Sequence, residues 1–88
     1  MLVGIPLEER DHFKESLGHY IRKYRQQKGL TIEETAEEAD TGMDHLGRIE
    51  RGEKLPTAYT FAKLCDAIDM DPHVILEILN ELKKYRLD

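Results

Sequence analysis

The spacing of apolar positions predicts helices along most of the chain. In residues 13–28 apolar side chains recur every three or four positions, which places them on one face of an α-helix; they are Phe13, Leu17, Tyr20, Ile21 and Tyr24. Similar stripes follow in residues 57–68 and in residues 72–86. No segment of useful length alternates between apolar and polar positions as a half-buried strand does. The pattern therefore predicts an all-α fold.

Residues 31–52 predict two short helices joined by a tight turn. Thr31 and Glu34 have the spacing of a capping box, in which each side chain bonds the other residue's backbone amide. Asp40 marks the turn, because aspartate tolerates the left-handed backbone conformation better than most residues. The second helix is expected at residues 43–51, directly before a glycine. This arrangement is typical of a helix-turn-helix, whose second helix is the candidate for insertion into a DNA groove.

Residues 1–12 have no clear period, and Pro6 disfavours an early helix. We therefore expect an N-terminal arm at 1–12, followed by the helix-turn-helix domain at 13–88. Along residues 72–86 the apolar band is wider than one contact requires, so either the first helix or a second subunit covers the excess. Exposed apolar patches are commonly interfaces. We favour the second subunit and expect a homodimer interface at Val74, Leu76, Leu79, Leu82 and Tyr85.

Composition excludes several classes of protein. The chain has 88 residues, enough for one small domain. Its single cysteine, Cys65, lies on an apolar stripe and excludes an internal disulfide framework, which favours a cytoplasmic location. No apolar run approaches the ~18 residues of a membrane span. The four histidines lack metal-ligand spacing and no nucleophile–base motif is present, so the sequence indicates no enzyme, metal or cofactor.

The net charge of −5 disfavours a nucleic-acid partner, but the distribution of charge matters more than the total. Residues 22–28 carry four positive charges and no negative ones. Arg48, Arg51 and Lys54 add three more near the second helix of the motif. Because screening limits charge effects to about 10 Å, a thin cationic face is compatible with an acidic chain.

Three segments resemble the Cro and phage-repressor type of helix-turn-helix, the XRE family. They are RxxKGLT at 25–31, ExxA at 33–36 and RIERGEKLPT at 48–57. The resemblance implies a five-helix lambda-repressor-like domain with an extended C-terminal helix. It also implies a sequence-specific regulator of transcription, with a repressor as the expected kind. Such a protein binds double-stranded DNA through the groove-facing helix and usually acts as a dimer.

The resemblance also assigns roles to individual residues. Arg25 and Glu50 match the family's buried structural ion pair. The positions expected to contact bases are Thr41, Gly42, Met43, Asp44, His45 and Arg48. The positions expected to contact phosphates are Arg22, Thr31, Arg51, Lys54, Thr57 and Tyr59.

Elementary chemistry suits several of these side chains to DNA. An arginine such as Arg48 can donate to O6 and N7 of guanine, Asp44 can accept from the cytosine amino group, and Met43 can touch a thymine methyl. Asp44 is equally explained as a first-turn charge favoured by the helix dipole. Ile32 stands where many relatives have glutamine. Together with Met43 and the acidic residues of 33–40, it supports an alternative, in which the scaffold binds a protein partner as an antirepressor, an antitoxin-like protein or an accessory subunit.

Overall fold

Five α-helices follow one another in the computed structural model, which describes the backbone of residues 5–86 and the side chains of residues 9–84. They are α1 (Ile5–Lys28), α2 (Ile32–Glu38), α3 (Met43–Glu50), α4 (Ala58–Ile68) and α5 (Val74–Arg86). The described residues contain no strand. The prediction of an all-α, five-helix fold is therefore confirmed.

Helix α1 begins earlier than the sequence suggested. It starts at Ile5 and runs without a break to Lys28, so the arm expected at residues 1–12 is wrong for 5–12. Pro6 does not prevent this, because a proline in the first turn lacks only an amide that would have no helical partner there. Residues 1–4 lie outside the described part of the chain.

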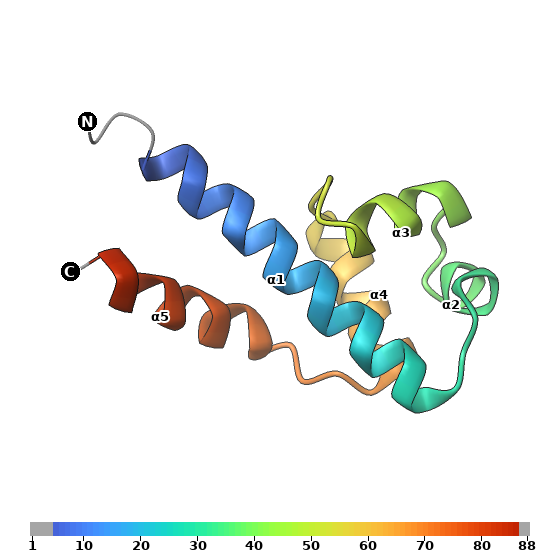
Figure 1. Ribbon diagram of the computed structural model, residues 1–88. Helices are drawn as coiled ribbons and strands as arrows, with labels where there is room; N and C mark the ends of the chain where they lie inside the picture. Colours follow the sequence, from blue (N-terminus) through green and yellow to red (C-terminus); the bar gives the residue numbers. More distant parts are fainter. Residues whose placement is uncertain (1–4, 87–88) are drawn as a thin grey trace.

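The core lies around the C-terminal half of α1. The largest fully buried apolar side chains come from four helices: Ile21 of α1, Leu46 and Ile49 of α3, Leu64 and Ile68 of α4, and Ile78 of α5. Helix α1 packs against α3, α4 and α5, while α2 packs against α3 and α4. In Figure 1, α5 runs back along α1 on the side away from α3. The helix-turn-helix helices are thus held by one face of α1 and by α4.

Gly18 permits close contact between α1 and α3. A Cβ atom at this position would lie 2.4 Å from the carbonyl oxygen of Ile49 and 2.6 Å from that of Glu50. Any larger side chain would therefore collide with backbone atoms of the last turn of α3. A glycine inside a strongly helical segment is a signal of close packing, so the sequence alone indicates a contact at Gly18.

The helix ends follow local chemistry. Gly29 has φ of +79°, as expected after α1, and the Leu30 amide donates to the Arg25 carbonyl at 3.1 Å. Asp69 adopts a left-handed conformation after α4, with φ of 55°, and its carboxylate pairs with Lys28. The sequence did not predict this second aspartate turn, which ties the end of α1 to the end of α4.

The burial of residues in α5 shows that part of the expected dimer surface was wrong. Val74 is only 4% exposed and belongs to the chain's own core, so it is unavailable to a second subunit. Leu79 and Leu82 are half-buried, and Leu76 is 47% exposed. Since α1 packs along α5, the first helix covers much of the wide apolar band. The side chain of Tyr85 lies outside the described residues.

Candidate nucleic-acid interface

The start of α2 has the predicted capping box. The Glu34 amide donates to Oγ1 of Thr31 at 3.0 Å, and the Thr31 amide donates to Oε1 of Glu34 at 2.9 Å. The turn after α2 is also as predicted, with Asp40 in the left-handed region at φ of 56°. Thr35 and Ala36 are buried where α2 packs against its neighbours. The two helices therefore form the helix-turn-helix expected at residues 31–52.

An ion pair fixes this unit to α1. Arg25 donates through Nε to Oε2 of Glu50 at 2.6 Å and through Nη2 to Oε1 at 3.0 Å. Its remaining terminal nitrogen, Nη1, donates to the Leu30 carbonyl at 2.9 Å. The side chains of Arg25 and Glu50 are 10% and 4% exposed. The pair that the resemblance implied is present, and it joins the end of α1, the loop before α2 and the end of α3.

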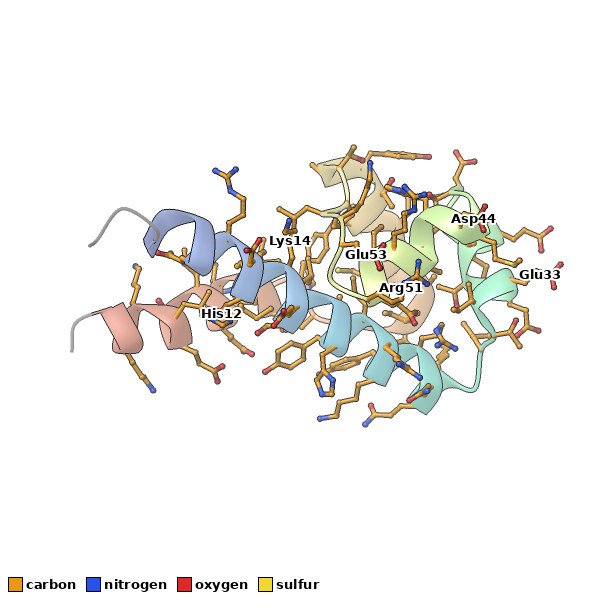
Figure 2. All side chains as sticks on the ribbon, turned by 45° about the horizontal axis from the view of Figure 1, so that its top comes forward. His12, Lys14, Glu33, Asp44, Arg51 and Glu53 are labelled. Carbon is orange, nitrogen blue, oxygen red and sulfur yellow. The ribbon has the colours of Figure 1, made fainter. Side chains whose placement is uncertain are left out.

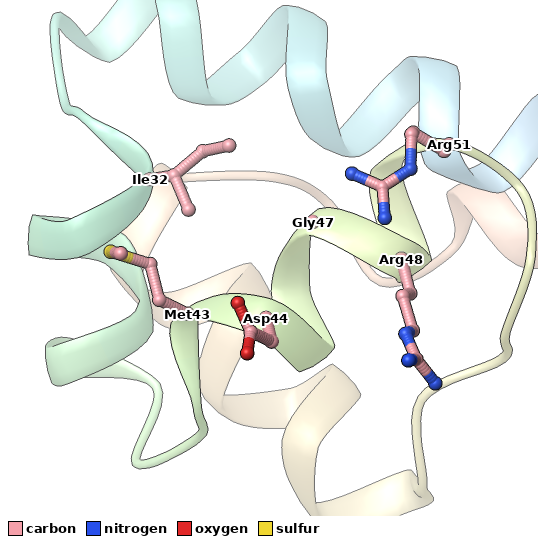
Figure 3. Close-up of a pocket in the computed structure, with 6 residues that line it drawn as sticks. All are labelled: Ile32, Met43, Asp44, Gly47, Arg48 and Arg51. Carbon is pink, nitrogen blue, oxygen red and sulfur yellow. The ribbon is translucent and has the colours of Figure 1, made fainter.

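Helix α3 is divided into a buried and an exposed face. Leu46 and Ile49 point into the core, whereas Asp44, Arg48 and Met43 are exposed, Met43 at 53%. Between α2 and α3 lies an open cavity of about 410 Å³. Its lining residues are labelled in Figure 3: Ile32, Met43, Asp44, Gly47, Arg48 and Arg51. This surface is the candidate interface.

The positions expected to contact bases cluster at the N-terminal end of α3. Gly42 is its N-cap and has no side chain, so the first amides of α3 donate to no capping side chain. Thr41 and His45 are half-buried, while Gly42, Met43 and Asp44 are exposed. Arg48 lies one turn further along, and among the described side chains it makes no ion pair.

The positions expected to contact phosphates are all exposed, but the hydroxyl groups of three of them already have partners. Oγ1 of Thr31 lies 3.2 Å from Oε1 of Glu34, and Oγ1 of Thr57 accepts from the Thr60 amide at 3.1 Å. Tyr59 is 58% exposed and donates to a carboxylate oxygen of Asp40 at 3.4 Å. Arg22, Arg51 and Lys54 complete the set of exposed positions.

Arg51 is partly neutralised by its neighbour. Its Nε donates to Oε2 of Glu53 at 2.9 Å, and Figure 2 shows the two side chains together beside α1. The hydrogen bond with Glu53 raises the pKa of Arg51, and the same bond lowers the pKa of Glu53 below its usual value. Glu53 therefore stays ionised to lower pH than a free glutamate. Glu50 of α3 is already paired with Arg25, so the exposed charges of α3 and the segment after it are the cations Arg48, Arg51 and Lys54 and the carboxylates Asp44 and Glu53.

Other kinds of site have little support in the described part of the chain. Within residues 9–84, no three His, Cys, Asp or Glu side chains are arranged to hold a metal ion. Cys65 is buried, and desolvation raises the pKa of its thiol to about 11, which keeps it in the unreactive protonated form. No helix within residues 5–86 is long and apolar enough to cross a bilayer.

Comparison with known proteins assigns the family. A family model described as a helix-turn-helix domain matches residues 16–77, most of the chain. The chain belongs to the helix-turn-helix domain family. This result confirms the family resemblance that was based on the segments at 25–31, 33–36 and 48–57.

Individual relatives agree with this family. The transcriptional regulator ClgR of Mycobacterium tuberculosis is 30% identical over 63 residues, which cover 72% of this chain and 56% of that protein. The HTH-type transcriptional regulator SinR of Bacillus subtilis is 30% identical over 66 residues, covering 74% and 60%. This chain thus spans little more than half the length of these curated relatives. A crystal structure of the clp gene regulator ClgR from Corynebacterium glutamicum is similar with a TM-score of 0.70 and 28% identity, covering 85% of this chain and 81% of that one.

Proposed function

We propose that this protein is a sequence-specific DNA-binding regulator of transcription that acts in the cytoplasm without catalysing a reaction. The main support is the exposed outer face of α3, which the buried ion pair of Arg25 and Glu50 fixes to α1. A helix fixed in this way can enter the major groove without a change in its backbone or its position. Repression is the expected mode, since a small domain on a promoter can exclude other proteins from the same DNA.

In this proposal α3 contacts base edges and its surroundings contact the backbone. Arg48, which is exposed and unpaired among the described side chains, donates to O6 and N7 of a guanine. Asp44 accepts from a cytosine amino group. Arg22, Arg51 and Lys54 neutralise phosphates on either side of the groove. The hydroxyl groups of Thr31 and Thr57 already have partners. At these two positions the phosphate is therefore bound by backbone amides at the starts of α2 and α4.

Selection of duplexes from a random pool, followed by binding measurements over a salt series, tests the proposal. About three phosphate contacts per subunit of a dimer give a slope of log K against log salt of about −5. Arg48→Ala should relax the base preference at one position in each half-site, whereas Lys83→Ala, on the exposed surface of α5, serves as the matched control. Selection that enriches no sequence, or binding that does not change with salt, would contradict the proposal.

We also propose that the protein binds a two-fold site as a homodimer. Leu76, at 47% exposed, with the half-buried Leu79 and Leu82, supports an interface on α5. Sedimentation of Leu76→Glu against the unchanged chain tests this, with a monomer expected for the variant. A variant that sediments with the same mass as the parent protein would contradict it.

The cavity beside α3 favours a second candidate function, the binding of a protein partner. Ile32 and Met43 give this surface an apolar part that DNA phosphates do not require. Under this alternative, co-purification recovers a defined protein, and Met43→Glu abolishes its binding while DNA selection enriches nothing. Recovery of an enriched DNA sequence whose binding depends on Arg48 would favour the first function instead.

A further inference from the structure

We propose that the cavity between α2 and α3 is a subsite for the 5-methyl group of a pyrimidine, which ordinary DNA supplies as thymine. This inference rests on the proposed DNA-binding function and specifies what one part of that surface selects. It assigns a role to Ile32, which stands at the start of α2 outside the helix that enters the groove.

The apolar part of the cavity comes from two helices. Ile32 is the first residue of α2 and is half-buried, and Met43 is the first residue of α3 and is 53% exposed. In Figure 3 the end of the Met43 side chain is directed towards Ile32, while Arg48 points away from both. The two side chains thus border one corner of the cavity with carbon and sulfur atoms alone.

Gly47 keeps the adjoining wall of this cavity open. A Cβ atom there would meet only the end of the Arg51 side chain, at 3.2 Å from Nη1, and no backbone atom within 4 Å outside its own helix. The absence of a side chain at this position is therefore not required by packing, in contrast to Gly18. It leaves room on the side of α3 that faces Ile32.

Among the groups that bases present in the major groove, the thymine methyl is the apolar one. The side chains of Ile32 and Met43 offer no strong hydrogen-bond partner, so a base amino or carbonyl group placed between them would lose its bonds to water without compensation. A methyl group has no such bonds to lose, and its burial is favourable. The polar groups at the cavity rim, Asp44 and Arg48, remain available to the edges of neighbouring bases.

Uracil substitution tests the inference, because uracil differs from thymine only by the methyl group. The probe is a duplex selected from a random pool by the full chain, resynthesised with uracil in place of each thymine in turn. We expect one position per half-site at which uracil weakens binding about fourfold, the effect of burying one methyl group. In Met43→Ala and Ile32→Ala the difference between thymine and uracil at that position should disappear. In Lys83→Ala, which shortens an exposed side chain on α5 that has no assigned role in binding, it should persist.

Gly47→Ala provides a variant that fills the cavity without removing any contact of the core. It should reduce the preference for thymine over uracil while the melting temperature does not fall, so a loss of selectivity cannot be assigned to unfolding. Duplexes with 5-methylcytosine or cytosine at the same position distinguish the source of the methyl group. We expect the duplex with 5-methylcytosine to bind more tightly than the duplex with cytosine, because the subsite contacts the methyl group itself.

Two results would overturn it while leaving DNA binding intact. One is equal affinity for thymine and uracil at every position of the selected duplex. The other is a uracil effect that is unchanged in both Met43→Ala and Ile32→Ala. Failure to bind any duplex would overturn the proposed function and this inference together, so the two failures are distinguishable.

Discussion

Replacing Gly18 with alanine should destabilise the protein, although the same change inside an isolated helix would stabilise it. Gly18 lies in the interior of α1, where alanine gains about 0.5–1 kcal/mol over glycine from backbone entropy. The last turn of α3 opposes this gain in stability, because its backbone lies against Gly18. The added Cβ atom would lie 2.4 Å from one carbonyl oxygen and 2.6 Å from another.

The size of the expected loss of stability follows from these two distances between the added Cβ atom and the carbonyl oxygens. Ordinary contact with a Cβ atom begins near 3.4 Å, so α1 and α3 must separate by about 1 Å at this point. The atoms that obstruct the methyl group are backbone, which cannot rotate away as a side chain can. Overpacking of this kind costs about 1–3 kcal/mol, and the backbone contacts place this case at the upper end. The net loss is about 2 kcal/mol, which lowers the melting temperature by about 8–16 °C for a domain of this size.

Thermal unfolding followed by circular dichroism measures this effect, and Gly47→Ala is the matched control. Gly47 also lies inside a helix, but its added Cβ atom meets only the flexible end of Arg51. We expect this variant to gain about 0.5–1 kcal/mol and to melt about 2–8 °C higher. If Gly18→Ala melted at or above the temperature of the unchanged protein, the close approach of α1 to α3 would be refuted as the reason for glycine at this position.

Three further predictions concern charged and buried groups. Glu50→Ala leaves the Arg25 guanidinium buried without its partner and should cost about 3–5 kcal/mol in a denaturant titration; an unchanged midpoint would contradict the role of the pair. Glu53→Gln releases Arg51 and should both strengthen DNA binding and steepen its salt dependence, whereas a weaker complex would show that the carboxylate contributes to binding. Cys65, whose pKa is raised to about 11, should resist alkylation at pH 8 until the protein unfolds, and rapid labelling of the native protein would contradict its burial.

The parts of the fold that depend on local chemistry were predictable from the sequence. Capping at Thr31, the left-handed turn at Asp40 and the end of α1 at Gly29 each involve residues within a few positions of one another. The apolar stripes at residues 57–68 and 72–86 predicted α4 and α5 to within two residues of their ends. The start of α1 was missed because Pro6 was treated as a barrier, although the first helical turn accepts proline.

Features that depend on distant parts of the chain were not predictable in the same way. A glycine inside a helical segment signals close packing at Gly18, but nothing local shows that α3 is the neighbour, and the pairing of Lys28 with Asp69 has no local signature. The burial of Val74 was missed because a helical stripe shows which residues share a face but not which neighbour covers them. The apolar corner formed by Ile32 and Met43 likewise required the crossing of two helices, since the residues are eleven positions apart.

The three hydrogen bonds of Arg25 have a consequence for the energetics of recognition. One guanidinium holds the end of α1, the loop before α2 and the end of α3 in a single arrangement. The surface presented to a ligand is therefore preorganised, and association does not require the backbone of that surface to lose freedom on contact. Little of the binding free energy is then lost to ordering the protein. Differences in affinity among target sequences should therefore appear mainly in the dissociation rates of the complexes.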